Sequence, residues 1–249
     1  MVPLKIIKIA STESTNSYAE KLLSQRKIDT PVCIVAIDQT SGKGLEQNNW
    51  ESEPGKNLTI SIVCFPEFLP ATKQFTLNKT VALAVFDTLK LLLPNERIHI
   101  KWPNDIYINN KKAAGILIQT SVQGQRMNWA IIGIGININQ KTFPKNIPNP
   151  ASVIQYKNTE SDLDKVLDNF IKAFNKCFSQ LEAGKIDWID KQYLENLYLI
   201  NSRSKYIFNG KKNWATIVGV NQYGWLKLSV SDGKIIECDM KQVQFIIGK

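Results

Sequence analysis

The feature that most constrains the fold is a series of short apolar strands between residues 97 and 138, with no helical periodicity between them. The segment from Arg97 to Trp102 alternates strictly between polar and apolar side chains, which is the two-residue period of a β-strand. Turns at Asn109-Asn110 and near Gly124 join the next strands, and strands joined by short turns pair antiparallel. The pattern therefore predicts a mixed, mostly antiparallel sheet. Its predicted strands cover residues 97–102, 106–108, 113–122 and 129–138.

Helices and further strands are predicted on both sides of this series. The helices cover residues 14–27, 71–93, 161–183 and 188–199, and additional strands cover residues 32–37 and 57–65. Ser17 and Glu20 fit a capping box for the first helix, whereas the prolines in residues 139–160 exclude a regular helix or central strand there. After Asn201, turns such as Asp232-Gly233 separate five short strands, which predict a small β-barrel-like module. These strands cover residues 205–208, 213–220, 225–230, 235–239 and 243–247. The fold class is therefore α+β.

The composition excludes several kinds of chemistry. His99 is the only histidine, so no multi-histidine metal site can be built and a Ser-His-Asp triad could use that residue alone. The four cysteines are scattered without a C-x-x-C pair, which favours buried thiols in a reducing compartment and predicts no metal centre. No apolar run is long enough for a signal peptide or membrane span, so we expect a cytoplasmic chain without a membrane partner. The net charge of +9 suits a nucleic acid, an anionic cofactor or an acidic protein, and does not decide among them.

Two N-terminal segments offer groups that suit a small polar or anionic ligand. Ser14-Thr15-Asn16 begins the first predicted helix and, taken alone, is a plain helix cap. In the loop of residues 38–56, two glycines flank Lys43 and permit close backbone approach to an anion, while Trp50 offers a flat surface for a base. The loop lacks the P-loop pattern, and taken alone it is equally typical of a mobile surface loop.

A third segment places a cation, an amide and a carboxylate close together. Lys101 lies on the polar face of its strand, where a ligand could reach it, and Asn104 and Asp105 follow a proline that stops strand pairing. Lys101 alone would be an ordinary exposed strand lysine, but the whole set is harder to explain in that way. The later Gly133-x-Gly135 run lacks the last glycine of a dinucleotide fingerprint and no βαβ unit surrounds it, so a Rossmann fold is excluded.

Together these segments resemble the biotin protein ligases, over nearly the whole chain and in the same order. The matching elements are Ser14-Thr15-Asn16, Gln39 with the glycine-rich loop ending at Trp50, Lys101-Trp-Pro-Asn-Asp105, Lys112 to Leu117, Gly135-Ile-Asn137 and the C-terminal β module. The resemblance implies a catalytic ligase domain over residues 1–200, with a central mixed, mostly antiparallel sheet and flanking helices that binds biotin and ATP. It also implies a small SH3-like β-barrel over residues 201–249.

The resemblance further implies a two-step reaction. Biotin and ATP, with Mg²⁺, would give biotinyl-5′-adenylate, which is transferred to one lysine of a biotin carboxyl carrier domain of a carboxylase. Ser14, Thr15 and Gln39 would hydrogen-bond the ureido end of biotin, Lys101 would stabilise the developing charge, and Trp50 would support the adenine. The implied catalytic residues are Lys43, Lys101, Asn104 and Asp105. The implied binding residues are Ser14, Thr15, Asn16, Gln39, Gly42, Lys43, Gly44, Leu45, Trp50, Lys101, Lys112, Gly115, Gly135 and Asn137.

The sequence departs from the family pattern in the glycine-rich loop. The family loop reads G-R-G-R-x-G-R or close to it, whereas this chain has Gly42-Lys43-Gly44-Leu45-Glu46-Gln47-Asn48. Leu45 stands where a second arginine often contacts the intermediate, so we hypothesise weaker retention of the adenylate. Because the motifs begin at Ser14, we expect no winged helix-turn-helix domain ahead of them and no specific DNA binding.

Three alternatives stay open from the residues. A lipoate-protein ligase has a similar fold, and a degenerate ligase would bind biotin without turning it over. A basic module for single-stranded nucleic acid would need aromatic side chains interleaved with cations on one sheet face. The aromatic residues available for this are Tyr206, Phe208, Trp214, Tyr223 and Trp225. A homodimer paired through sheet edges is an expectation from the family, and the sequence does not name the carrier protein or the order of substrate binding.

Overall fold

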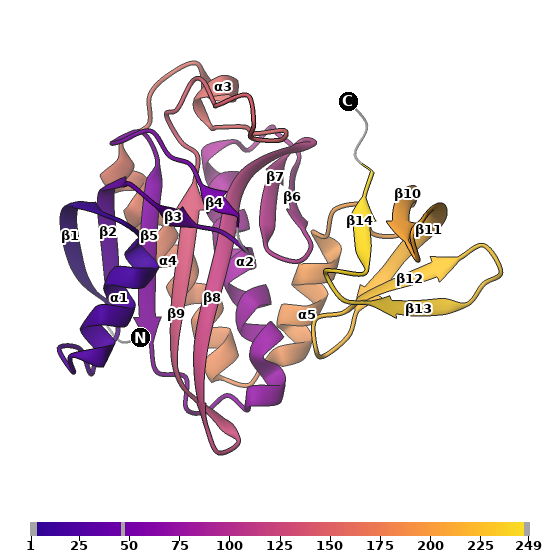
Figure 1. Ribbon diagram of the computed structural model, residues 1–249, viewed down its shortest axis with the longest axis horizontal. Helices are drawn as coiled ribbons and strands as arrows, with labels where there is room; N and C mark the ends of the chain where they lie inside the picture. The colour runs from indigo at the N-terminus through magenta and orange to yellow at the C-terminus, as the bar shows by residue number, and fades with distance from the viewer. Residues whose placement is uncertain (1–3, 46–47, 247–249) are drawn as a thin grey trace.

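The computed structural model describes residues 4–45 and 48–246, which form two separate main sheets (Figure 1). The larger sheet has seven strands in the order β1-β2-β5-β9-β8-β7-β6; β1 and β2 are parallel, and every other neighbouring pair is antiparallel. Its strands are β1 (Lys5–Thr12), β2 (Val32–Gln39), β5 (Leu58–Cys64), β6 (Ile98–Lys101), β7 (Asp105–Ile108), β8 (Lys111–Gln123) and β9 (Arg126–Ile136). The predicted mixed, mostly antiparallel sheet is confirmed.

Helices cover both faces of this sheet, with α2 and α4 behind it and α1 in front in the view of Figure 1. The helices are α1 (Thr15–Ser24), α2 (Gln74–Leu92), α3 (Ile154–Lys157), α4 (Leu163–Glu182) and α5 (Ile186–Glu195), with a 3-10 turn η1 (Ala71–Lys73) before α2. Asp162 caps α4 by accepting hydrogen bonds from the backbone N–H groups of Asp164 and Lys165, so the expected acidic N-terminus is present. Among the described residues no helix is long and apolar enough to cross a membrane.

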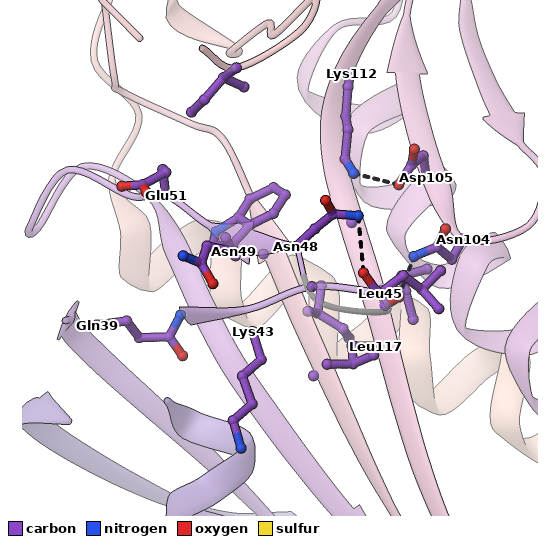
Figure 2. Close-up of a pocket in the computed structure, with 18 of the residues that line it drawn as sticks. Gln39, Lys43, Leu45, Asn48, Asn49, Glu51, Asn104, Asp105, Lys112 and Leu117 are labelled. Carbon is purple, nitrogen blue, oxygen red and sulfur yellow. Dashed lines mark hydrogen bonds and ion pairs between the residues drawn. The ribbon is translucent and has the colours of Figure 1, made fainter. Parts of the chain in front are cut away.

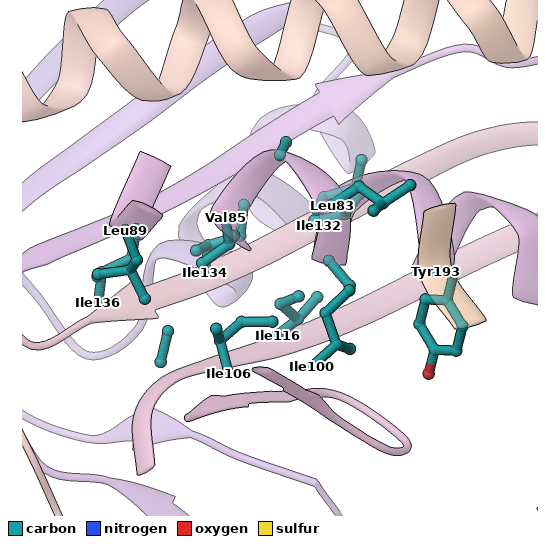
Figure 3. Close-up of a cluster of buried hydrophobic side chains, with 14 of the residues drawn as sticks. Leu83, Val85, Leu89, Ile100, Ile106, Ile116, Ile132, Ile134, Ile136 and Tyr193 are labelled. Atoms are coloured by element: carbon teal, nitrogen blue, oxygen red, sulfur yellow. The ribbon is translucent and has the colours of Figure 1, made fainter. Parts of the chain in front are cut away.

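The main core lies between the sheet and α2, as Figure 3 shows. Alternation along β9 directs Ile132, Ile134 and Ile136 to this side, where they pack with Leu83 and Leu89 of α2. Burying each of these side chains contributes about 1.5–3 kcal/mol relative to leaving it in water. The two positions between these isoleucines are Gly133 and Gly135, so this part of the opposite face is left without side chains.

The opposite face of the sheet is divided between a small apolar cluster and a polar region. Ala19 of α1 packs on Ile34, Val63 and Ile131, which fixes the helix at one end of the face. The rest of this face includes Ser61 of β5, Gly115 of β8, and Gly133 and Gly135 of β9. The fold therefore separates an apolar core on one side from a polar surface on the other.

The second sheet forms the C-terminal module, which we define as strands β10–β14. Its order is β13-β12-β11-β10-β14, all antiparallel. The strands are β10 (Arg203–Phe208), β11 (Lys211–Val220), β12 (Leu226–Val230), β13 (Ile235–Cys238) and β14 (Val243–Phe245). The module packs on the larger part of the protein through Trp102, whose Nε1 donates a hydrogen bond of 2.7 Å to the Gly224 carbonyl. A β-carbon at Gly224 would overlap Phe75, so this junction requires glycine. The predicted α+β fold class is confirmed, whereas the division at residues 200 and 201 stays a prediction.

Three local predictions are wrong. The first helix begins at Thr15 with Ser14 as its N-cap and no side-chain cap, so Ser17 lies inside the helix and the predicted capping box is not formed. The prolines of residues 139–160 end at Pro150, and the short helix α3 forms after them. The loop of residues 38–56 is not structureless, because it contains a two-stranded hairpin of β3 (Gly42–Lys43) and β4 (Asn49–Trp50). Glu46, Gln47 and Ile247, which the sequence analysis included, lie outside the described residues.

Candidate active site

A cavity of about 520 Å³ lies on the polar face of the larger sheet. It is bounded by the start of α1, the β3–β4 hairpin, the β6–β7 turn, strands β8 and β9, and the loop of residues 143–150. Most of the residues predicted from the sequence meet here. Those that line the cavity are Ser14, Thr15, Asn16, Gln39, Lys43, Gly44, Leu45, Trp50, Asn104, Asp105, Lys112, Gly115, Gly135 and Asn137. Two predicted residues, Gly42 and Lys101, do not line it.

One end of the cavity is a buried hydrogen-bond network at the start of α1. The backbone N–H and the hydroxyl of Thr15 donate to Gln39 Oε1 at 2.8 and 3.0 Å. Ser61 Oγ lies 2.7 Å from Thr15 Oγ1 and 2.6 Å from Asn16 Oδ1, and Asn16 Nδ2 donates to Gln119 Oε1 at 2.9 Å. Because the hydroxyls of Thr15 and Ser61 and the amide of Asn16 are each held by neighbours, these side chains present a fixed pattern of donors and acceptors to a ligand.

Sequence reasoning missed two members of this network. Ser61 lies in the middle of β5 and Gln119 in β8, both on strands that read as apolar sheet elements. The available signal was the strand period, since Ser61 and Thr59 interrupt the isoleucines of β5 at every second position. Their contact with Asn16 depends on the sheet order, which the sequence does not specify.

The other end of the cavity is built around Trp50. Gly115 and Gly135 are paired across β8 and β9, and a β-carbon on Gly135 would overlap the indole ring. A β-carbon on Gly115 would lie 3.0 Å from the ring, so the two glycines form a flat platform for the indole. The indole Nε1 is buried and has no hydrogen-bond partner among the described residues. A ligand with an acceptor at this point would satisfy it.

Gly42 supports Trp50 although it does not line the cavity. It pairs with Trp50 in the β3–β4 hairpin, and a β-carbon on it would overlap the Trp50 carbonyl oxygen. The hairpin is closed by the Gly44 N–H, which donates to the Asn48 carbonyl at 2.7 Å. Leu45 thereby becomes part of the cavity wall.

The charged groups of the cavity are shown in Figure 2. Lys112 and Asp105 form an ion pair of 2.7 Å, with 33% and 11% of their side chains exposed, and Lys112 Nζ lies 5.8 Å from the centre of a Trp50 ring. Lys43 is exposed and extends away from this pair, so the two cations lie on different sides of the hairpin (Figure 2). An ammonium held by a carboxylate beside an aromatic ring is suited to bind an anion attached to a planar base.

Two amides lie beside the charged groups. Asn104 Nδ2 donates to the Ile116 carbonyl at 2.8 Å, which ties the β6–β7 turn to β8. Asn137 Nδ2 donates to the Ala151 carbonyl at 2.9 Å, but its Oδ1 is buried and has no hydrogen-bond partner among the described residues. Asn137 therefore offers a free acceptor at the cavity.

The loop of residues 143–150 completes the cavity wall, a role that is not predicted from the sequence. Its contribution is largely apolar, and three prolines restrict its backbone. The contributing residues are Phe143, Asn146, Ile147, Pro148 and Pro150.

Lys101 differs from its predicted position. The strand pattern placed it where a ligand could reach it, but its side chain is only partly exposed and its Nζ lies 4.7 Å from the centre of the Phe245 ring. It lines a second cavity of about 180 Å³ between the β6–β7 turn and the C-terminal module. Burial lowers the pKa of the Lys101 ammonium; the charge of Lys112 also lowers it, whereas Asp105 opposes both. The strand period gave the correct face of the sheet, but the module covers that face.

Thiol and imidazole groups lie away from the large cavity. All four cysteines are free and buried, as predicted, and burial raises the pKa of Cys33 and Cys64 to about 12, so these thiols stay protonated. The His99 ring lies 5.9 Å from the Tyr198 ring, and burial lowers its pKa. Within residues 4–45 and 48–246 no cluster of three or more His, Cys, Asp or Glu side chains could hold a metal ion.

The comparisons with known proteins assign the chain to a family. The model of the biotin/lipoate A/B protein ligase family matches residues 9–137, which is half of the chain and includes most of the cavity residues. The chain belongs to this family.

Two curated relatives show how similar the chain is to individual members of the family. A bifunctional ligase/repressor BirA of Bacillus spizizenii is 34% identical over 168 residues, which cover 66% of this chain and 51% of that protein. A biotin–[acetyl-CoA-carboxylase] ligase of Paracoccus denitrificans is 31% identical over 180 residues, covering 70% of this chain and 73% of that protein. The chain thus spans about half the length of the Bacillus relatives.

Among solved structures, the biotin protein ligase of Aquifex aeolicus in complex with biotin and ATP has the same fold. It matches with a TM-score of 0.80 at 22% identity, and the alignment covers 98% of this chain and 99% of that one.

Proposed function

We propose that this protein is a biotin–[acetyl-CoA-carboxylase] ligase, which joins biotin to ATP and transfers the biotinyl group to a lysine of a carrier domain. The observation that carries the proposal is the two-ended cavity, with a fixed hydrogen-bond network at one end and a tryptophan on a glycine platform at the other. The name of the Paracoccus denitrificans relative, a biotin–[acetyl-CoA-carboxylase] ligase, supports biotin as the acid that is activated.

The network end suits the ureido group of biotin, which has two N–H donors and one carbonyl acceptor. Ser14, Thr15, Asn16 and Gln39 line this end and offer both hydroxyl and amide groups. In the proposed arrangement, the carboxylate of biotin extends from this end toward Lys112 and Asp105.

The Trp50 end suits the adenosine of ATP. The indole on its glycine platform offers a stacking surface, and Asn137 Oδ1 and Trp50 Nε1 are buried and unpaired in the described residues. Lys43 and the glycines of the hairpin would then close over the phosphate.

The first reaction step joins two groups of like charge. A carboxylate oxygen of biotin attacks the α-phosphorus of ATP, the bond to the bridging oxygen breaks, and pyrophosphate leaves. Lysine ammonium groups at the reacting atoms reduce the repulsion and stabilise the charge that develops. In the second step an amine of the carrier attacks the acyl carbon, and AMP leaves. Lys43, Lys101 and Lys112 are the cations proposed to act here, with Asn104 and Asp105 as groups that hold the β6–β7 turn.

Mg²⁺ would enter this site with ATP. The carboxylates at the cavity are Glu51 and Asp105, and Asp105 is already paired with Lys112. A Mg²⁺ ion that arrives with ATP usually needs only one or two protein carboxylates beside the phosphates and water, so Glu51 and Asp105 are the groups that would contact it. When bound, the ion supplies charge neutralisation on the ATP phosphates.

The proposed partner is a biotin carboxyl carrier domain of a biotin-dependent carboxylase. The net charge of +9 favours an acidic partner, and the buried free thiols suit the cytoplasm. A homodimer and the absence of specific DNA binding stay predictions.

The alternatives have less support. Of the five aromatic residues available for a nucleic-acid surface, Tyr206 and Phe208 are buried inside the C-terminal module. They therefore do not share one exposed face with Trp214. The fold is the same for a lipoate-protein ligase as for a biotin protein ligase. The choice between biotin and lipoate as substrate distinguishes the two functions.

Pyrophosphate exchange into ATP tests the proposal directly. We expect exchange that depends on biotin, with lipoate supporting less than about one hundredth of that rate, because the network end matches ureido donors and acceptors that lipoate lacks. Label from pyrophosphate is counted in ATP at matched concentrations of either acid. Exchange with lipoate alone, or with neither acid, would contradict the proposed function, and biotin binding without exchange would indicate the degenerate ligase.

Leu45 gives a second prediction about this site. Leu45→Arg is expected to slow release of biotinyl-adenylate by about tenfold, because a guanidinium at the cavity wall adds a charge-assisted hydrogen bond to the phosphate. Release is measured by rapid filtration of preformed adenylate complex, and Leu45→Met serves as the uncharged control. Equal release rates in Leu45→Arg and the wild type would contradict the hypothesis that Leu45 weakens retention of the adenylate.

A further inference from the structure

The junction between the β6–β7 turn and the C-terminal module brings together residues that are far apart in the chain. Lys101 ends β6, and Phe245 ends β14, which Figure 1 shows beside the β6–β7 pair. Lys101 Nζ lies 4.7 Å from the centre of the Phe245 ring. Both residues line the 180 Å³ cavity, together with Trp102, Pro103, Met240, Val243 and Gln244.

The ring of Phe245 is held in a fixed orientation. Its edge-to-face contact with Tyr206 has a centroid distance of 5.2 Å and an interplanar angle of 78°, and Tyr206 is fully buried. Tyr206 and Phe245 are also backbone partners between β10 and β14. Because the strand and the neighbouring ring fix Phe245, its face is presented to one position in space.

Lys101 is also connected to the large cavity. It is the backbone partner of Asp105, which lines that cavity and pairs with Lys112 at 2.7 Å. A lysine side chain has four rotatable bonds and loses conformational freedom whenever its ammonium is held in one place. Without another partner the Lys101 ammonium would compete with Lys112 for Asp105, which would disturb the ion pair at the cavity.

We propose that Phe245 of the C-terminal module is a positioning residue for Lys101, with its ring face holding the ammonium beside the β6–β7 turn and away from the Lys112–Asp105 pair. This inference rests on the proposed function, in which Lys101 supplies charge to the reacting carboxylate and phosphate. A cation over an aromatic face is stabilised by the ring quadrupole, and the stabilisation grows when water is excluded. The module thereby acts on the reaction through Lys101 and contacts neither biotin nor ATP.

Phe245→Leu tests the role of the ring. This variant keeps an apolar side chain but removes the aromatic face, so we expect kcat for biotin-dependent pyrophosphate exchange to fall by about tenfold. The KM values for biotin and ATP should change less than about twofold, since Phe245 does not line the large cavity. Phe245→Tyr keeps the face and should retain wild-type kcat. The matched control is Trp214→Leu, which removes an exposed ring near Arg203 and Lys205 of the same module and should leave exchange unchanged.

A second pair of measurements separates positioning from a general effect on folding. In a Lys101→Ala background, Phe245→Leu should cause no further loss of exchange. In the wild type, NMR should show the ε-methylene protons of Lys101 shifted upfield by the ring, and Phe245→Leu should remove that shift. This shift is observable whether or not the protein exchanges pyrophosphate.

Three results would overturn the inference. The first is an unchanged or raised kcat in Phe245→Leu. The second is that Phe245→Leu lowers exchange in the Lys101→Ala background by the same factor as in the wild type. The third is that the ε-methylene protons of Lys101 show no upfield shift in the wild type. Should Phe245→Leu fail to fold, Phe245→Met gives the same comparison, and the wild-type resonance still decides. An absence of biotin-dependent exchange in the wild type would refute the proposed function instead, so the two failures are distinguishable.

Discussion

Replacing Lys101 by alanine is expected to lower biotin-dependent pyrophosphate exchange by about 100- to 1,000-fold, whereas Lys43→Ala lowers it by about fivefold. The difference follows from how each lysine is held. Lys101 extends from a strand whose backbone pairs with β7, and its ammonium has a fixed aromatic partner. Lys43 is exposed on a two-residue strand of the hairpin, so holding its side chain over a phosphate costs more conformational entropy.

The position of Lys101 outside the large cavity is compatible with this expectation. The β6–β7 turn that follows it contributes Asn104 and Asp105 to the cavity wall, so the lysine backbone is already at the boundary. The ammonium held over the Phe245 ring therefore lies beside the turn that borders the cavity, and its positive charge acts on anionic groups bound there.

Comparing the Lys101→Ala and Lys43→Ala variants requires a control lysine from the same sheet that has no role in the site. Lys111→Ala is that control, since Lys111 is exposed, adjoins Lys112 and does not line the cavity. Initial exchange rates at saturating biotin and ATP, with circular dichroism to verify folding, would measure the effect. Equal losses in the Lys101→Ala and Lys43→Ala variants would argue against the distinction between a rigidly placed and a mobile cation.

The sequence predicted the sheet well because its strands carry a strict two-residue period. In β9, Ile132, Ile134 and Ile136 alternate with glycines, and this pattern alone determines which side faces the core. The same glycines leave part of the opposite face without side chains, and nothing in the strand pattern predicts the use of that bare surface. The use of Gly135 as a platform for Trp50 depends on the path of a loop that starts almost a hundred residues earlier, which no local pattern encodes.

Site residues that belong to short sequence motifs could be predicted from the sequence. Site residues that reach the cavity only through tertiary contacts could not. Ser14, Thr15 and Gln39 belong to segments that the family resemblance singled out, and they meet at the cavity. Ser61 joins them only because β5 lies beside the start of α1. The predicted exposure of Lys101 was wrong for a related reason. Its strand pattern was correct, but Phe245, which lies against its ammonium, comes from the far end of the chain.

Gly133→Ala is expected to weaken biotin binding by about 100-fold, while the fold is kept. A β-carbon at this position would overlap Asn16 Oδ1, so the Asn16 side chain has to move. The movement separates Asn16 from Ser61, at 2.6 Å, and from Gln119, at 2.9 Å. Breaking two buried hydrogen bonds costs about 1–3 kcal/mol for each group left unsatisfied, and a loss of about 2.7 kcal/mol corresponds to a factor of 100.

The added methyl group would overlap Asn16 at the biotin end of the cavity, so the effect of Gly133→Ala should appear in biotin binding. Calorimetric titration with biotin should reveal the loss in Gly133→Ala, and the double variant Gly133→Ala/Asn16→Ser should recover part of it, because serine is short enough to avoid the added methyl group. Gly219→Ala is the matched control: its β-carbon would have no neighbour closer than 3.9 Å, and biotin affinity should be unchanged. A folded Gly133→Ala protein with wild-type affinity would mean that Asn16 and its partners do not shape the biotin end of the cavity. Since Asn16 and Ser61 belong to α1 and β5 and not to the hairpin, the loss of biotin affinity should appear in the absence of nucleotide as well.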